Sequence, residues 1–197
     1  MTKFKSKTSN TIILIIVRLS NILIAIALSA TLSRVITDKA IYGSLQQLLM
    51  IYSMLSVIFA MGVPQSIFYF LPRYQGGERK GLLIQNILLL FIQGAILGII
   101  LFFLRGWFGH TFNSTYLPAY LRYFALFPVF MLPTLSVEGA LMIYGRVKTF
   151  MLFSILSRAF TFLSLALPII LGSTFENAVM VWVISSFLLI IISLILV

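Results

Sequence analysis

Three charged side chains lie within long apolar segments of this chain, where the cost of a charge usually indicates a functional role. Arg18 lies roughly 10 Å into the first apolar segment, and Arg158 lies roughly 15 Å into a later one, near its midpoint. Glu138 stands near the end of a third segment. Because a guanidinium binds phosphate oxygens through two parallel hydrogen bonds, the arginines predict a cationic cavity for an anionic head group such as phosphate or pyrophosphate.

Small and polar residues share a helical face with each arginine, because they recur every three or four positions. In the first segment this face holds Arg18, Asn21, Ala25, Ser29 and Ser33. In the segment of Arg158 it holds Ser154, Ser157, Thr161, Ser164 and Pro168. We expect Asn21, Ser29 and Asn86 to meet sugars or water in the cavity. The alternatives are a small-residue packing face and, for Arg18, a side chain that reaches back to the head groups.

Glu138 and Arg18 are expected at a similar depth in the membrane. An ion pair between them would lower the cost of burying both charges, and a role of Glu138 in proton or ion coupling is the alternative. Arg34 and Arg122 fall near the outer ends of their segments, so we expect them at the outer mouth of the cavity.

The remaining composition argues against catalysis, metal binding and nucleic-acid binding. The chain has no cysteine, one histidine and four acidic residues, so we expect no metal cluster, no catalytic residues and no cofactor. The net charge of +10 comes from cations scattered between apolar segments, which fits contact with anionic lipid head groups. We therefore expect membrane lipid, and no nucleic acid, among the partners.

The elements that must position these residues are membrane-spanning helices. The chain is 61% hydrophobic and 9% charged, whereas a soluble domain is about a quarter charged. We predict one all-α bundle over residues 1–197 with six spans, and a kink near Gly62 and Pro64. The spans are expected at about 11–36, 43–71, 82–104, 118–144, 148–172 and 176–197, with a loop at 105–117.

The basic residues predict that the N-terminus is cytoplasmic, since eight of them would lie inside and four outside. The inside set is Lys3, Lys5, Lys7, Arg73, Arg79, Lys80, Arg146 and Lys148, and the outside set is Arg34, Lys39, Arg105 and Arg122. The last apolar segment has no basic flank after it, so we expect the sequence to be the N-terminal part of a longer chain.

Residues 17–74 resemble the opening of the polysaccharide-export flippases (Wzx type) of the MATE/oligosaccharide-flippase/lipid II flippase superfamily. The resemblance rests on Arg18, on Arg34 before the turn, on the Tyr42-Gly43 pair, on the stretch from Gly62 to Arg73, and on Gly145, Arg146 and Lys148. It implies the N-terminal lobe of a two-bundle transporter in the bacterial inner membrane. Such a transporter would export undecaprenyl-pyrophosphate-linked oligosaccharide by alternating access, for O-antigen, capsule or exopolysaccharide.

The family chain has twelve to fourteen spans, so the resemblance also implies a second six-helix bundle, from the same longer chain or from another subunit. Arg18 and Arg158 would then hold the pyrophosphate of the lipid-linked anionic glycan. Two alternatives stay open: a cation-coupled drug or ion antiporter of the same fold, and a non-transporting membrane scaffold or truncated remnant.

Overall fold

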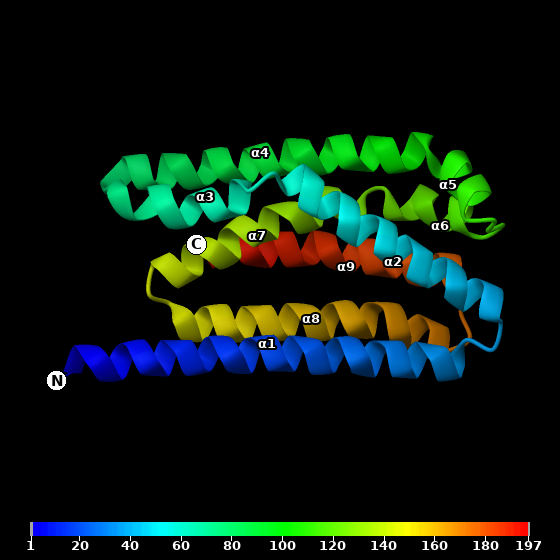
Figure 1. Ribbon diagram of the computed structural model, residues 1–197, viewed down its shortest axis with the longest axis horizontal. Coiled ribbons are helices and arrows are strands. Elements are labelled where there is room, and N and C mark those ends of the chain that lie inside the picture. The colour runs from blue at the N-terminus through cyan, green and yellow to red at the C-terminus, as the bar shows by residue number, and fades with distance from the viewer. Residues whose placement is uncertain (1, 197) are drawn as a thin grey trace.

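The computed structural model of the protein describes residues 2–196, and the side chains of residues 12–196. All regular structure in this range is helical (Figure 1). In a bilayer this is expected, because a helix satisfies its own backbone hydrogen bonds where no water can. The side chains of Lys3, Lys5 and Lys7, which contribute to the predicted orientation, lie outside the described ones.

Five helices are long and apolar enough to cross a membrane, or six if the bent pair α6 and α7 is one span. They are α1 (Thr2–Val35), α2 (Lys39–Ala60), α4 (Gly76–Phe103), α8 (Val147–Ile170) and α9 (Phe175–Ile195), with α6 (Leu117–Phe124) and α7 (Phe127–Ile143) as the pair. The all-α prediction is therefore confirmed, and the long apolar helices support a multi-pass membrane protein.

Two spans are broken where the sequence cannot continue a helix. Met61 and Gly62 both adopt left-handed backbone angles, with φ of 45° and 73°, and separate α2 from α3 (Val63–Phe70). The kink predicted near Gly62 and Pro64 is thus a break. Between α6 and α7 the chain bends by 52°, just before Pro128, which has no backbone N–H to donate.

The prediction of a loop at 105–117 is wrong for the first half of this segment. Residues Arg105–Thr111 form the short helix α5, and a 3-10 turn, η1 (Leu71–Arg73), precedes α4. Gly106 and Gly109 favour a loop in the sequence, but Phe108 packs against the core from within α5. Gly109 also lets α5 lie against Pro118 of α6, because a Cβ atom there would overlap the proline ring.

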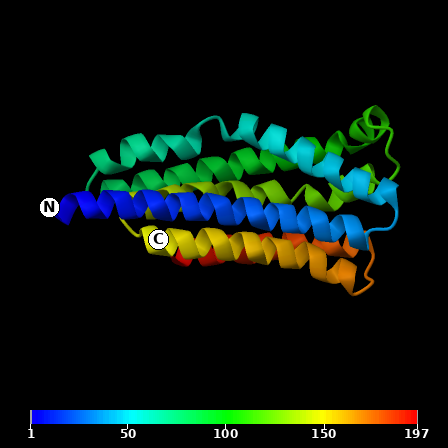
Figure 2. The same ribbon diagram turned by 60° about the horizontal axis from the view of Figure 1, so that its bottom comes forward.

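The helices run back and forth between two ends of the bundle (Figures 1 and 2). The beginning of α1, the η1–α4 turn and the α7–α8 turn lie at one end, which we call the N-terminal end. The α1–α2 turn, α5 and the α8–α9 turn lie at the far end. Cations of the predicted inside set whose side chains are described, Arg73, Arg79, Lys80, Arg146 and Lys148, therefore fall at the N-terminal end.

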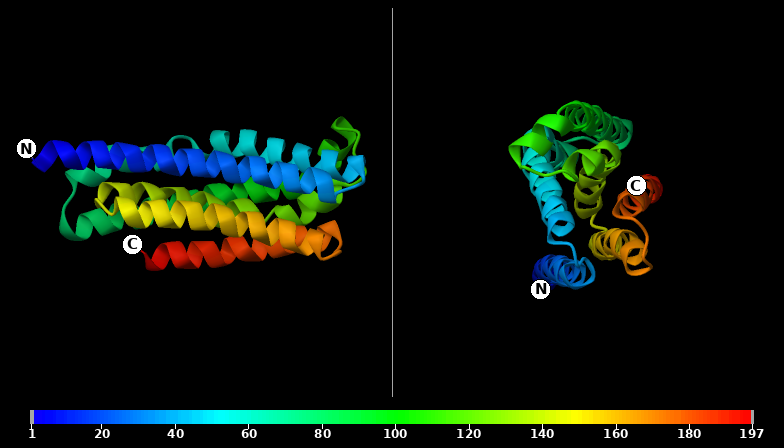
Figure 3. Two further views of the ribbon diagram at one scale, coloured as in Figure 1. Left: turned by 90° about the horizontal axis from the view of Figure 1, so that it is seen from below. Right: turned by 90° about the vertical axis from the view of Figure 1, so that its right-hand side faces the viewer.

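The largest buried hydrophobic cluster draws mainly on α2, α4, α6 and α9, whereas α1 contributes only Leu32 to it among the described buried residues. Gly94 and Gly98 let α4 approach α7 closely, since a Cβ atom on Gly94 would stand 2.6 Å from the Pro128 carbonyl oxygen. Helix α1 packs extensively only against α8 among the described helices. Helix α2 leaves the α1–α2 turn obliquely, so the two helices separate toward the N-terminal end (Figures 1 and 3).

Candidate functional site

The separation of α1 from α2 leaves a cavity of about 1030 Å³ inside the bundle. Residues of α1, α2, α3, α7 and α8 line it, and Trp182 of α9 contributes at one side. Most of the wall is apolar, and its polar members are Asn21, Gln46, Tyr52, Ser53, Ser56, Gln65, Glu138, Arg158 and Thr161. The volume is at the upper end of the range for small-molecule sites, which commonly combine apolar walls with a few placed polar groups.

Arg158 is turned into this cavity by the packing of α8 against α1. The residues on either side of the contact are small: Ser154 and Ser157 are both buried, and Asn21 Nδ2 donates a hydrogen bond to Ser154 Oγ at 3.3 Å. The next position along α8 is rotated by about 100°, which directs Arg158 away from α1. Ser154 therefore joins α8 to α1, as in the alternative interpretation of a packing face, and the arginine lines the cavity.

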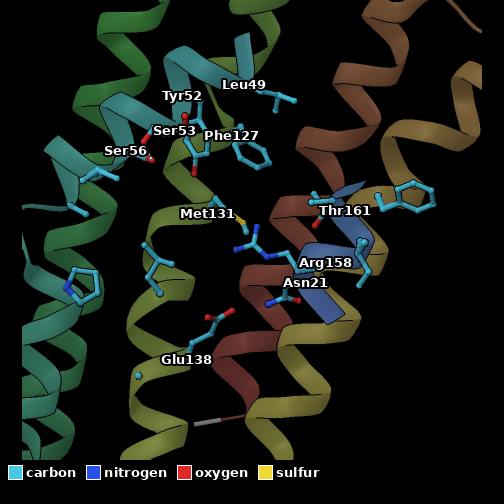
Figure 4. Close-up of a pocket in the computed structure, with 18 of the residues that line it drawn as sticks. Asn21, Leu49, Tyr52, Ser53, Ser56, Phe127, Met131, Glu138, Arg158 and Thr161 are labelled. Carbon is cyan, nitrogen blue, oxygen red and sulfur yellow. Dashed lines mark hydrogen bonds between the residues drawn. The ribbon is translucent and has the colours of Figure 1, made fainter. Parts of the chain in front are cut away.

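Glu138 faces Arg158 across the cavity. Figure 4 shows the two side chains pointing toward each other from α7 and α8, with the amide of Asn21 beside them. Since charges at membrane depth are costly, each of these groups lowers the cost of the other.

The structure does not place Arg18 with them. Val17 is the buried residue at this level of α1, 3% exposed and packed with Val137, Leu141 and Phe150. Arg18 is one helical position further round, is exposed, and does not line the cavity. The predicted depth of Arg18 near Glu138 agrees with this packing, but the arginine that faces Glu138 is Arg158 rather than Arg18. The lining charges are consequently one arginine and one glutamate rather than two arginines and one glutamate.

Of the other predicted binding residues, Asn21 lines the cavity and Ser29 and Asn86 do not. Ser29 Oγ lies 3.1 Å from the Tyr42 hydroxyl, which joins α1 to α2 near the far end. Asn86 donates to Ser66 Oγ at 3.2 Å and accepts from Ser136 Oγ at 3.4 Å. Asn86 therefore connects α4 with α3 and α7.

Arg34 and Arg122, the predicted mouth residues, are exposed at the far end and do not line the cavity. Arg34 stands in the last turn of α1. The Arg122 guanidinium lies 5.9 Å from the centre of the Tyr123 ring.

An aromatic wall closes one side of the cavity, and the sequence interpretation missed it. The Tyr52 ring meets Phe127 edge-on at 5.2 Å between centroids, and Trp182 lies 4.6 Å from Phe127. The sequence could have indicated that one face of α2 lines the cavity beside Tyr52, because the polar residues Gln46, Ser53 and Ser56 recur there at helical spacing. Trp182 had no comparable signal.

Two polar atoms of lining residues are buried without a hydrogen-bond partner in the described chain. They are Asn21 Oδ1, an acceptor, and the Trp182 indole N–H, a donor. Most buried polar groups are paired with protein or water, so unpaired groups on a cavity wall favour occupation by water or a ligand.

Comparisons with protein-family models, curated proteins and solved structures found no match. The functional argument therefore starts from the cavity: a compartment between apolar helices, with opposed charges and unpaired polar atoms.

Proposed function

We propose that this bundle binds the anionic head group of a lipid-linked oligosaccharide and belongs to a transporter that exports it across the bacterial inner membrane by alternating access. The observation that carries the proposal is the direction of Arg158, which points from a membrane-spanning helix into the cavity. An arginine at this depth marks a water-filled or ligand-filled path more often than a structural site.

The cavity supplies the two surfaces that such a substrate needs. The guanidinium of Arg158 can donate two parallel hydrogen bonds to phosphate oxygens, and Asn21, Ser53, Ser56 and Thr161 offer smaller polar groups beside it. The apolar remainder of the wall tolerates parts of a ligand that carry no charge. Glu138 would hold Arg158 in the empty cavity and exchange with the anionic ligand when it enters.

A second six-helix bundle is part of this proposal, from a longer chain or another subunit. Transport by alternating access requires two parts that move against each other around a site. Helix α1 has α8 as its one extensive contact among the described helices, so its other sides are open to lipid or to such a bundle. Exposed apolar residues cover these sides, including Ile15, Leu19, Leu23 and Ile26.

The proposal is tested by complementation of a strain that lacks export of its surface polysaccharide, using the gene in its natural length. We expect Arg158→Ala to abolish export, because it removes the phosphate-binding group. Arg122→Ala, at an exposed position outside the cavity, is the matched control and should retain export. Full export with Arg158→Ala, at equal protein level in the membrane, would contradict the proposal.

Glu138 favours one other function, a cation-coupled antiporter of drugs or ions. Its carboxylate lines the same cavity and is available to carry a proton or hold a cation. In this case Glu138→Gln would abolish resistance or ion exchange, and Arg158→Ala would leave substrate binding largely intact. Drug resistance that is unchanged by Glu138→Gln would exclude this alternative.

A further inference from the structure

A second cationic site lies at the N-terminal end of the bundle, where η1 turns into α4. We propose that this corner binds the phosphate of an anionic membrane lipid such as phosphatidylglycerol. The cations are Arg73, Arg79 and Lys80, and Glu78 is the one acid in the same stretch. The inference does not depend on the proposed transport function, because none of these residues lines the cavity.

Both arginines are held in place by tyrosine rings. The Arg73 guanidinium lies 3.6 Å from the centre of the Tyr69 ring, and that of Arg79 lies 4.4 Å from the centre of the Tyr144 ring. Contacts of this kind orient an arginine without neutralising its charge. The two guanidiniums therefore keep their positive charge for a ligand.

The corner itself is fixed by packing. Leu71 of η1 and Leu83 of α4 are buried together with Ile67 and Ala140, and the partly buried Tyr144 packs against them. Arg73 and Arg79 flank the tight turn through Tyr74 and Gln75, so the fold brings the two cations to one edge of the bundle. A ligand that binds at this edge does not need to order a flexible loop first.

Arg79 also has an unsatisfied donor. Its Nε atom is buried and has no hydrogen-bond partner in the described chain. Arg105, at the far end of the bundle, also has such a buried donor, its Nη1 atom.

The position favours a lipid over a soluble anion. Helix α4, which is long and apolar enough to span a membrane, begins at this corner. We therefore place the corner at the level of the lipid head groups. Tyr69 and Tyr74 are exposed beside it, as is usual for tyrosine at a membrane interface. Basic residues at such a surface are attracted to anionic lipids.

The test uses the purified full chain in a neutral detergent, with phosphatidylglycerol and phosphatidylcholine of equal chain length as probes. Bound lipid is counted by native mass spectrometry. We expect phosphatidylglycerol to bind preferentially, and Arg79→Gln to weaken its binding about fivefold, the usual effect of one cation at a membrane surface. Lys80→Gln, an exposed position without a ring contact, should act in the same direction.

Arg105→Gln is the matched control, because Arg105 stacks on Phe102 at 4.4 Å but lies in α5 at the far end. It should change phosphatidylglycerol binding less than about twofold, well below the effect of one head-group cation. Equal binding of the two lipids, or equal losses in Arg79→Gln and Arg105→Gln, would overturn the proposal. Displacement of the bound lipid by inorganic phosphate would overturn the assignment of this site to a lipid. If Arg79→Gln does not fold, the Lys80→Gln variant is the deciding test. Unchanged binding of phosphatidylglycerol to Lys80→Gln would then contradict the proposed site.

Discussion

Arg158 of α8 and Glu138 of α7 face each other across the cavity, although twenty residues separate them in the sequence. The α7–α8 hairpin brings them to a similar depth, and the contact of Ser154 with Asn21 of α1 leaves the arginine directed toward α7. The relationship places opposite charges on facing walls of the cavity. An anionic ligand would then have to compete with an internal carboxylate.

This opposition predicts energetic coupling between the two charges. Single neutralisation by Arg158→Gln or Glu138→Gln should lower the thermal midpoint, because it leaves one charge without its counter-charge. The double variant should be more stable than the sum of the two losses predicts, with a coupling free energy of about 1 kcal/mol. Thermal unfolding in detergent measures this cycle. Strict additivity of the two losses would mean that the charges do not interact.

Tyr52 is predicted to contribute a hydrogen bond to a ligand of Arg158. Tyr52 lines the cavity, and its ring is held by Phe124 at 5.4 Å and Phe127 at 5.2 Å. Tyr52→Phe keeps this packing and removes the hydroxyl, so stability should hold while affinity for inorganic pyrophosphate falls about fivefold, the value of one hydrogen bond.

The chain offers its own reporter for this measurement. It has two tryptophans, and Trp182 lines the cavity while Trp107 is exposed at the far end. In a Trp107→Phe background, Trp182 fluorescence can therefore follow pyrophosphate binding. Tyr42→Phe is the control, since Tyr42 bonds to Ser29 outside the cavity. An unchanged affinity in Tyr52→Phe would remove Tyr52 from the binding site.

Asn86 is predicted to be structural, in contrast to the sequence-based expectation of a binding role. Asn86→Ala removes the links to Ser66 and Ser136 and should cost about 1 kcal/mol, within the range for hydrogen bonds between membrane helices. Pyrophosphate affinity should not change. Gln85→Ala, at the exposed neighbouring position, should leave the stability unaltered. If Asn86→Ala loses pyrophosphate affinity but keeps full stability, Asn86 belongs to the binding site.

Gly98 is predicted to be required for the contact of α4 with the bend between α6 and α7. A Cβ atom there would overlap the Ala125 carbonyl oxygen, so Gly98→Ala must move backbone and should destabilise the bundle by about 2 kcal/mol. Gly106→Ala is the control, since nothing lies within 4 Å of a Cβ atom at that position. Thermal unfolding compares the two variants. Equal midpoints would show that α4 can move away from the Ala125 backbone without loss of stability.

The sequence was sufficient for the helical class and for most helix positions, because apolar length and turn residues determine both. It also indicated an irregularity near Gly62 and two of the residues that line the cavity, Asn21 and Arg158, whereas Glu138 was expected to pair with Arg18 or to couple ions. Rotation about each helix axis was the weak point. Arg18 and Val17 differ by one position, and only the packing of Val17 against α7 decides which of them faces inward.

The interhelical contacts of Asn86 and the aromatic wall could not be predicted from the sequence for a related reason. A buried polar residue in a membrane helix fits a binding site and an interhelical hydrogen bond equally well, and the partners of Asn86 lie 20 and 50 residues away. Trp182 and Phe127 come together only through the tertiary contact of α7 with α9. No periodicity within one helix reports such a contact.

The most direct test of the central claim, an anion-attracting aqueous cavity at Arg158, is cysteine labelling, because the chain has no cysteine of its own. Thr161→Cys places a thiol in the cavity one turn from Arg158, and Leu163→Cys places one on an exposed apolar position of the same helix. We predict that Thr161→Cys reacts with a water-soluble anionic thiosulfonate faster than with its cationic analogue, that Arg158→Gln removes this preference, and that Leu163→Cys stays unreactive. An unreactive Thr161→Cys, or a charge preference that survives Arg158→Gln, would contradict the account.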